Sequence, residues 1–388
     1  MLPNLAIKKH FGPKRVFAGV ILMFLGTIQI CAFAQSRSFD LSISREDRLK
    51  VFDAAWKAID KDFFDPKFNG VDWVSMKTKY RPLAESAANK SQLQRVLQTM
   101  FNELHTSHTF ANMGFSFGTG IVLYELGGRS VIYYVDQGSP ADLAGVQSGW
   151  VINSWNGDCW NGDQSNAIQY LDSHQQIKEL GIACKSYANA PDKPERSSRM
   201  LSSDVAYISF TKFRGGADVW LAAEVDKVRG AKTIVFDLRG NRGGDSEEVI
   251  RCLSLLFDKP VVIGRFQFRK SPLPMKVEGR KDAYSGKVLV LIDGRTGSGG
   301  EMFAAAIQDT GRGTLIGRRT AGAILLGKNH NLPQGFFATV AEADYFTAKN
   351  VRLEGRGIAP DEMVDYTFKD FQEHNDPDLD RVKTLLRR

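Results

Sequence analysis

Two segments of the chain share one pattern: an apolar run, a turn rich in glycine and the start of a helix. The first is FDLRGNRGGD, Phe236 to Asp245, and the second is VLVLIDGRTGSGGE, Val288 to Glu301. Apolar residues at successive positions are typical of strands in a sheet that is covered on both faces. If these strands are parallel neighbours, both turns meet at one sheet edge, where α/β proteins place ligand sites. The pattern predicts an α/β domain with its site between the two turns.

The second turn carries a serine, Ser298, for which three interpretations stand. A serine at a strand-to-helix turn has an exposed hydroxyl near N–H groups that no helix bond uses, so it can serve as a nucleophile. Ser298 and Glu301 also fit the helix-capping pattern S-x-x-E. Gly297-Ser298-Gly299 matches the first half of the dinucleotide pattern G-x-G-x-x-G, but Met302 takes the place of its third glycine.

The N-terminal segment, residues 1–34, has the order of a secretory signal peptide. A basic stretch precedes the apolar run Val16 to Ile30, and Ala32-Phe33-Ala34 predicts cleavage near Ala34, before Gln35. The alternative is an uncleaved anchor, although the run is short for a bilayer span, which takes roughly 20 residues. We expect an exported protein, periplasmic or secreted, that meets the membrane only in transit. The export signal also argues against a dinucleotide cofactor.

The net charge depends on this segment. Its four basic residues account for four of the +7 formal charges, so the exported chain carries +3. No block of lysine and arginine remains that would indicate a nucleic-acid partner.

Three cysteines stay in the exported chain. A disulfide between Cys159 and Cys184 fits an exported protein, and Cys252 is then left over and expected to be buried. The chain has no C-x-x-C and no H-E-x-x-H pattern, so we expect no metal site and no cofactor.

Residues 45–112 read as a helical module, because apolar side chains recur there at helical spacing. The module runs into His105-Thr-Ser-His108-Thr-Phe110. Two histidines three residues apart can share one helix face. A metal site built on such a pair needs a third ligand nearby, and none is evident in the sequence. A structural histidine is the plain alternative.

Residues 113–190 change to short strands and contain GSPADLAGVQSGWVINSWNG, Gly138 to Gly157. This segment resembles a PDZ domain, with Gly149-Trp150 where that family usually has Gly-Asp. The resemblance implies binding of extended peptides, often C-termini, by strand addition. Its carboxylate-binding loop falls on Phe117, Gly118, Thr119 and Gly120. The alternative is a structural β-domain with a blocked groove. Lys185 to Arg199 reads as a linker.

The motifs after the linker appear in a fixed order: DLRGNRGG, GSGGE, IGRRTAGA and EGRGIAPD. Together with the helical module and the PDZ-like segment, this order resembles the S41 peptidases, the tail-specific or C-terminal processing proteases, over roughly Glu46 to Phe368. The resemblance implies an α/β fold with a crotonase-like ββα catalytic core at 200–370, the PDZ β-domain inserted before it, and a helical, polar tail at 371–388.

Catalytic roles follow from the resemblance. It implies that Ser298 is the nucleophile and that the amides of Gly299 and Gly243 form the oxyanion hole, with Gly244 as the near alternative. Processing-protease members take their base from a lysine about 25 residues after the serine. Ala323 holds that position, and Lys328 is out of register.

The tricorn-like branch instead uses a histidine in an S-H pair and a glutamate shortly before G-V-x-P-D. Ser107-His108 matches the pair, and Glu354 lies three residues before Gly357-Ile-Ala-Pro-Asp361. The resemblance thus implies His108 as base, Glu354 as its orienting carboxylate and Ser107 as a supporting hydrogen-bonding residue. A histidine base activates a serine near pH 7, and a carboxylate fixes its tautomer. His105 and Glu301 are the competing base and carboxylate. His330 matches no motif and reads as a surface residue.

These expectations combine into an exported serine endopeptidase that cleaves polypeptides through an acyl-enzyme and holds them with a PDZ domain. The alternative is an inactive S41-like scaffold that binds peptides or ligands. The oligomeric state and the substrate stay open.

Overall fold

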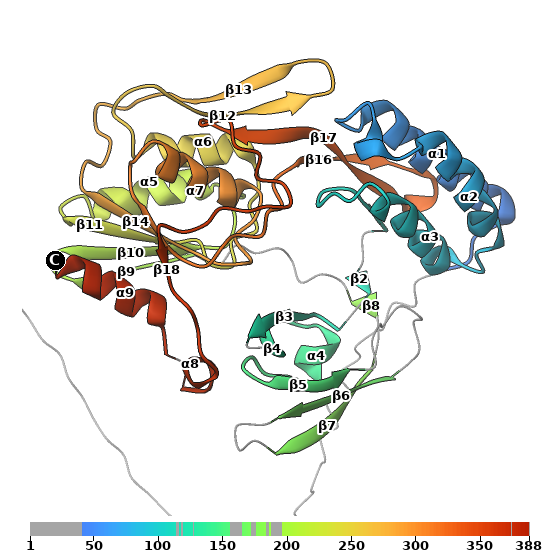
Figure 1. Ribbon diagram of the computed structural model, residues 1–388, viewed down its shortest axis with the longest axis horizontal. Coiled ribbons are helices and arrows are strands. Elements are labelled where there is room, and N and C mark those ends of the chain that lie inside the picture. The colour runs from blue at the N-terminus through green and yellow to red at the C-terminus, as the bar shows by residue number, and fades with distance from the viewer. Residues whose placement is uncertain are drawn as a thin grey trace, which may run out of the picture. The chain divides into compact units, whose positions relative to one another are not determined.

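The structure is a computed structural model (Figure 1). It describes residues 41–387 apart from 114–115, 118, 127, 156–164, 172–175, 184–185, 188–195 and 374. The expected signal peptide, the Cys159–Cys184 pair and Gly118 lie outside these residues. Cys252 is buried and free, as predicted. In the part of the chain that is described, no helix is both long and apolar enough to cross a membrane.

A six-stranded sheet carries both glycine turns. Its order is β18-β15-β14-β11-β10-β9, and all neighbours are parallel except the edge pair β10 and β9. The strands are β9 (Arg196–Ser202), β10 (Val205–Phe210), β11 (Thr233–Asp237), β14 (Lys287–Ile292), β15 (Thr314–Gly317) and β18 (Glu362–Met363). The predicted parallel pairing is confirmed, because β11 lies directly beside β14. The linker prediction is wrong for Arg196 to Arg199, which pair with β10.

Three helices cover one face of this sheet and separate it from a second sheet (Figure 1). They are α5 (Ala217–Lys227), α6 (Ser246–Ser254) and α7 (Gly299–Asp309). The second sheet is antiparallel and has the order β1-β17-β12-β13, with β16 also paired to β17. Its strands are β1 (Phe110–Asn112), β12 (Val261–Phe268), β13 (Pro272–Val277), β16 (Leu326–Asn331) and β17 (Phe337–Thr347), and η3 (Pro333–Gly335) joins the last two. The main hydrophobic core fills the space between the sheets.

The C-terminal helices follow the sheet, with α9 on its opposite face. They are α8 (Phe368–Glu373) and α9 (Pro377–Leu386). Val382 of α9 is buried against Leu289 and other residues of the parallel strands. Asp378 is fully buried and pairs with Arg318 and with Arg239, which belongs to the first glycine turn. The tail is therefore helical, and its buried side chains anchor it to the core.

Three N-terminal helices pack on the ends of β16 and β17. They are α1 (Arg45–Asp62), α2 (Trp73–Ser86) and α3 (Lys90–Asn102), with η1 (Phe68–Gly70) between the first two. Ser44 caps α1 by accepting from the N–H of Asp47. The apolar face of these helices forms one core with strand residues such as Ala338 and Val340. After α3 the chain continues into β1, which pairs with β17, and His108 lies against Gly327 of β16.

Residues between these parts form a small antiparallel β-domain. Its sheet runs β3-β4-β5-β6-β7, with β2 and β8 paired separately. The elements are β2 (Ser116–Phe117), β3 (Ile121–Leu126), β4 (Arg129–Val135), α4 (Pro140–Leu143), β5 (Val151–Trp155), β6 (Ser165–Leu171), β7 (Ile177–Ala183) and β8 (Ser186–Tyr187). Its core includes Ile132, Ala141 and Ile168. Trp150 stacks on Tyr170 with ring centroids 3.7 Å apart, which explains a tryptophan at this turn.

Candidate active site

Ser298 lies at the sharp turn between β14 and α7. Its backbone has φ 51° and ψ −121°, a conformation that a non-glycine residue adopts at a cost of about 1–3 kcal/mol. Its N–H donates to Ala323 O at 2.7 Å and to the Glu301 carboxylate at 3.2 Å. The side chain is half-buried and takes part in a capping box, in which the serine oxygen faces the backbone N–H of Glu301. The turn therefore holds both the backbone and the side-chain oxygen of this serine in place.

Glu301 anchors a neighbouring segment to this turn. Its fully buried carboxylate accepts from Thr320 Oγ1 at 2.5 Å, Gly322 N at 2.8 Å and Ala323 N at 2.9 Å, besides the N–H of Ser298. Burial raises the pKa of Glu301, while these four donors oppose the shift. Both oxygens are thus engaged in holding residues 320–323 against the turn that carries Ser298. The helix cap predicted at Ser298 and Glu301 is confirmed.

The two glycine turns touch. A Cβ on Gly243 would lie 2.4 Å from Gly299 N and 2.6 Å from Ser298 Cβ, so only glycine fits there. The N–H of Gly243 is already engaged, because it donates to Asn241 Oδ1 at 2.9 Å. Among the described residues, the N–H groups of Gly244 and Gly299 have no hydrogen-bond partner. The donor geometry therefore favours Gly244 over Gly243 as the companion of Gly299 in an oxyanion hole.

Ser107, His108 and Glu354 form a hydrogen-bonded relay. Ser107 Oγ lies 2.7 Å from His108 Nδ1 and donates to Glu354 Oε2 at 3.0 Å, and Ser107 N donates to Glu354 Oε1 at 2.8 Å. Because the hydroxyl proton goes to the carboxylate, Ser107 Oγ can accept from His108 Nδ1–H. That tautomer leaves Nε2 with a free lone pair. Glu354 acts on the histidine through the serine hydroxyl rather than by direct contact.

A short segment joins this relay to the turn that carries Ser298. Ala323 O accepts the Ser298 N–H, and the next residue, Ile324, donates its N–H to Glu354 Oε2 at 3.1 Å. Within the described residues, Ser298 Oγ and His108 do not form a hydrogen bond. Catalytic hydrogen bonds are often long before substrate binds, so this gap is compatible with a base and its nucleophile.

The environment of His108 lowers its pKa. Burial disfavours the charged ring, and the negative charge of Glu354 partly opposes that effect. The imidazole is therefore neutral near pH 7 and able to accept a proton at Nε2. Its position depends on Gly327 of β16, where a Cβ would lie 3.3 Å from His108 Cβ.

The alternative bases lie elsewhere. His105 is exposed and has a positive φ of 50°. Lys328 is exposed too, and its Nζ lies 3.9 Å from the carboxylate of Glu342. His330 was expected at the surface but is half-buried, and it hydrogen-bonds Glu342.

The predicted carboxylate-binding loop is described in part. Thr119 is buried and its carbonyl accepts the Ala141 N–H at 2.9 Å. A Cβ on Gly120 would lie 2.2 Å from Ser139 Cβ, so the loop packs closely on the start of α4. Phe117 ends β2, where it pairs with Ser186 of β8.

Asp293 is a site residue that the sequence interpretation missed. Its carboxylate accepts from Gly240 N and Arg295 N, both at 3.0 Å, and from the hydroxyl of Tyr133 in β4. The Arg295 guanidinium also lies 4.2 Å from the ring centroid of Tyr134. Asp293 thus ties together both glycine turns and the β-domain. Its carboxylate accepts the N–H of Arg295, two residues later, which is an Asx turn. An aspartate in the glycine-rich turn was the signal that the sequence offered.

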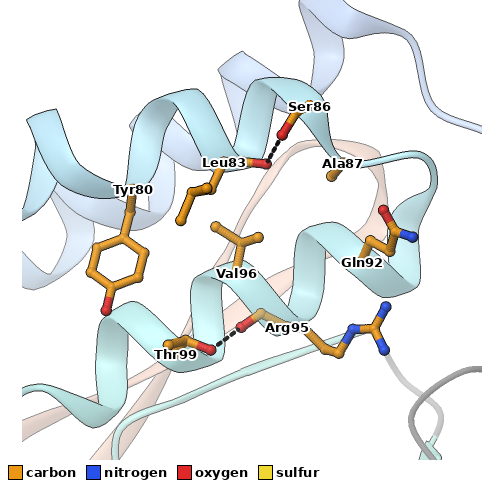
Figure 2. A pocket seen from close by; sticks show the side chains of 8 residues that line it. All are labelled: Tyr80, Leu83, Ser86, Ala87, Gln92, Arg95, Val96 and Thr99. Atoms are coloured by element: carbon orange, nitrogen blue, oxygen red, sulfur yellow. Dashed lines mark hydrogen bonds between the residues drawn. The ribbon is translucent and has the colours of Figure 1, made fainter.

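A groove of about 320 Å³ lies between α2 and α3 (Figure 2). Tyr80, Val96 and Thr99 are among its lining residues. Thr99 Oγ1 donates to the Arg95 carbonyl and Ser86 Oγ to the Leu83 carbonyl, so these hydroxyls serve the helices themselves. The groove brings no catalytic set together.

Comparisons with known proteins cover most of the chain. The family described as peptidase family S41 matches residues 204–364, and the tricorn protease C1 domain matches residues 44–102. A carboxyl-terminal-processing protease of Synechocystis is 23% identical over 371 residues, 87% of this chain and 85% of the relative. The chloroplastic carboxyl-terminal-processing peptidase 1 of Arabidopsis thaliana is 25% identical over 348 residues, 80% of this chain and 71% of the relative. The solved structure of mature CPAF complexed with lactacystin has a similar fold, with a TM-score of 0.68, 12% identity and coverage of 89% of this chain and 99% of that one.

Proposed function

Because this chain belongs to peptidase family S41 and is a serine-type peptidase, we propose that it is an exported endopeptidase that cleaves polypeptides through an acyl-enzyme on Ser298. The relatives are named for carboxyl-terminal processing, which favours a substrate segment near a polypeptide C-terminus.

The proposed reaction begins with His108. Its Nε2 takes the proton of Ser298 Oγ as that oxygen attacks the scissile carbonyl carbon. The N–H groups of Gly244 and Gly299 stabilise the oxyanion, with a contribution of about 3–4 kcal/mol from such a donor. The C–N bond then breaks, and His108 returns its proton to the leaving amine. Water hydrolyses the Ser298 ester by the same steps, again with His108 as base.

The observation that carries this proposal is the connection of the relay to the nucleophile turn. Residues 323 and 324 hydrogen-bond Ser298 on one side and Glu354 on the other, at 2.7 and 3.1 Å. A plain helix cap does not require a strained backbone, yet Ser298 has a positive φ of 51°. A strained serine at a strand-to-helix turn supports a nucleophile at this position.

Substrate holding is assigned to the β-domain as a PDZ-type module beside a crotonase-like core. β3 pairs only with β4 in the described sheet, so its other edge is available to add a peptide strand. The segment Thr119–Gly120 directly precedes β3, which places its backbone at the end of that edge.

The decisive experiment compares wild type with Ser298→Ala on an unfolded polypeptide substrate and with a fluorophosphonate probe. We expect hydrolysis and a single covalent adduct on Ser298 in wild type, and neither in the variant. Ser254→Ala is a matched control, because its hydroxyl only bonds the Arg251 carbonyl within α6. Hydrolysis that persists in Ser298→Ala contradicts the assignment. Export is tested separately by N-terminal sequencing of the mature protein, for which we expect Gln35 as the first residue.

A further inference from the structure

A second group of chemically active side chains lies at the junction of α1 with β16 and β17. It consists of Asp62 at the end of α1, His330 on β16 and Glu342 on β17. One ligand atom from each residue lies within 4.8 Å of the other two. His330 Nε2 is 2.9 Å from Glu342 Oε1, and His330 Nδ1 is 3.8 Å from Asp62 Oδ2. The proposed peptidase reaction uses none of these residues.

We propose that Asp62, His330 and Glu342 form a binding site for a divalent transition-metal ion of the zinc class. One imidazole nitrogen and two carboxylate oxygens are ligands that Zn²⁺ takes at about 2.0–2.2 Å. Three such ligands leave a fourth position for water in a tetrahedral shell.

The distances fit a site that closes by side-chain rotation. Tetrahedral bonds of about 2.0–2.1 Å place ligand atoms roughly 3.3 Å apart. The three atoms already lie within 4.8 Å of one another, so side-chain rotations that shorten each separation by at most about 1.5 Å bring them onto one ion. The backbone is held in place independently, because Phe64 N, just beyond α1, donates to Ala341 O of β17 at 2.9 Å.

Burial and charge also suit a cation. The three side chains are 17–27% exposed, which shields the ligands yet leaves access for an ion and a water molecule. Two carboxylates and a neutral imidazole carry a charge of −2, which matches a divalent ion. Lys61 and Lys328 lie nearby, but each Nζ is 3.9 Å from its carboxylate, beyond hydrogen-bond distance. Both lysines are about 70% exposed and free to swing into water.

The position of the site gives the ion a structural effect. It joins residue 62 to residues 330 and 342, so a bound ion crosslinks the first helix to the strand pair β16–β17. Gly327, which supports His108, lies three positions before His330 on β16. The ion stabilises the fold that presents His108 and takes no part in the peptidase chemistry.

The test is isothermal titration of untagged protein with ZnCl₂, together with thermal unfolding. We expect one Zn²⁺ per chain and a higher Tm in wild type. Affinity falls at least tenfold in each of Asp62→Asn, His330→Gln and Glu342→Gln, and these variants lose the Zn²⁺-dependent rise in Tm. The control His105→Asn removes an exposed histidine, keeps a residue that tolerates positive φ, and binds as wild type does.

The proposal is overturned if wild type binds no Zn²⁺ or if the three variants bind as tightly as wild type. The second result would place the ion on cysteine thiols or on His108. Circular dichroism of each variant checks that it is folded. Where one is not, the visible spectrum of Co²⁺-loaded wild type decides: bands of a nitrogen–oxygen shell are expected, and a thiolate charge-transfer band contradicts the site.

Discussion

Ser107 Oγ lies 2.7 Å from Nδ1 of its neighbour His108. The same hydroxyl donates to Glu354 at 3.0 Å, so the carboxylate acts on the histidine across a serine. Two consecutive residues thus hold the proposed base and the hydroxyl that contacts its ring, and Glu354 also receives the Ser107 N–H. The relay makes Ser107 a positioning residue with testable consequences.

Removing the Ser107 hydroxyl breaks this relay. Ser107→Ala leaves His108 Nδ1 without its partner, so the ring loses its fixed tautomer and orientation. We expect kcat/KM on a peptide substrate to fall on the order of 10- to 100-fold, mainly in kcat, since general acid–base catalysis contributes about 10²–10⁴. Ser107→Thr keeps the hydroxyl and restores most of the rate. Equal rates in Ser107→Ala and wild type contradict the relay.

The pH profile reports the charge of Glu354. Burial lowers the pKa of His108 by more than the negative charge of Glu354 raises it. The acid limb of kcat/KM should therefore lie below the usual imidazole range. Activity is lost as pH falls through that pKa, because a protonated ring cannot act as base. Glu354→Gln removes the raising charge and should move the acid limb to still lower pH, with a lower plateau. The exposed change Glu46→Gln should leave the profile in place. An acid limb that moves upward in Glu354→Gln contradicts this assignment.

Gly327 supports the imidazole from β16. A Cβ there would lie 2.9 Å from Thr339 Cγ2 and 3.3 Å from His108 Cβ, both tighter than ordinary contact. We expect Gly327→Ala to displace His108 and to lower kcat about 10-fold or more with little change in KM, because small misplacements of a catalytic group are costly. Gly311→Ala is the control, because nothing lies within 4 Å of its Cβ position. Its φ of 70° makes this variant less stable, but kcat should stay unchanged. A normal kcat in Gly327→Ala shows that the ring has room to adjust.

Glu301 should matter for stability as well as activity. Its buried carboxylate accepts from four donors, and a glutamine would turn an N–H₂ group toward some of them. A buried donor left unsatisfied costs about 1–3 kcal/mol, so Glu301→Gln should lower the free energy of unfolding by that order. Urea denaturation measures it, with Glu46→Gln as the exposed control. An unchanged denaturation midpoint would mean that the carboxylate does not hold residues 320–323.

Asp378 anchors the C-terminal helix to the first glycine turn. It is fully buried and contacts Arg239 at 2.9 Å and Arg318 at 2.9 Å. Removing one member of a buried ion pair costs about 3–5 kcal/mol, so Asp378→Asn should lower the unfolding free energy by several kcal/mol. Asp380→Asn on the same helix is the control, because its side chain is 68% exposed. Similar denaturation midpoints for the two variants would show that the anchor contributes little.

Local patterns were enough to predict the strand-turn-helix units. The apolar runs of β11 and β14 and the glycines that follow them dictate these elements, because strand burial and positive φ are properties of a few consecutive residues. Parallel pairing of the two strands then followed from their shared pattern. The boundary at Arg196 was not predictable in this way, since an edge strand with exposed side chains lacks an apolar signal.

The chain by itself therefore determined which residue types stand at each turn: the serine, the S-H pair and the glutamate before the Gly-Ile-Ala-Pro-Asp segment. Tertiary structure decided which of them are in contact. It assigned Glu301 to the loop and Glu354 to Ser107, engaged the N–H of Gly243 while leaving that of Gly244 unpaired, and placed His330 between two carboxylates. The physical reason is that most of these contacts join segments that are distant in the sequence and that meet only when the sheets, helices and loops pack together. Packing joins residues up to 280 positions apart, and no local pattern records it.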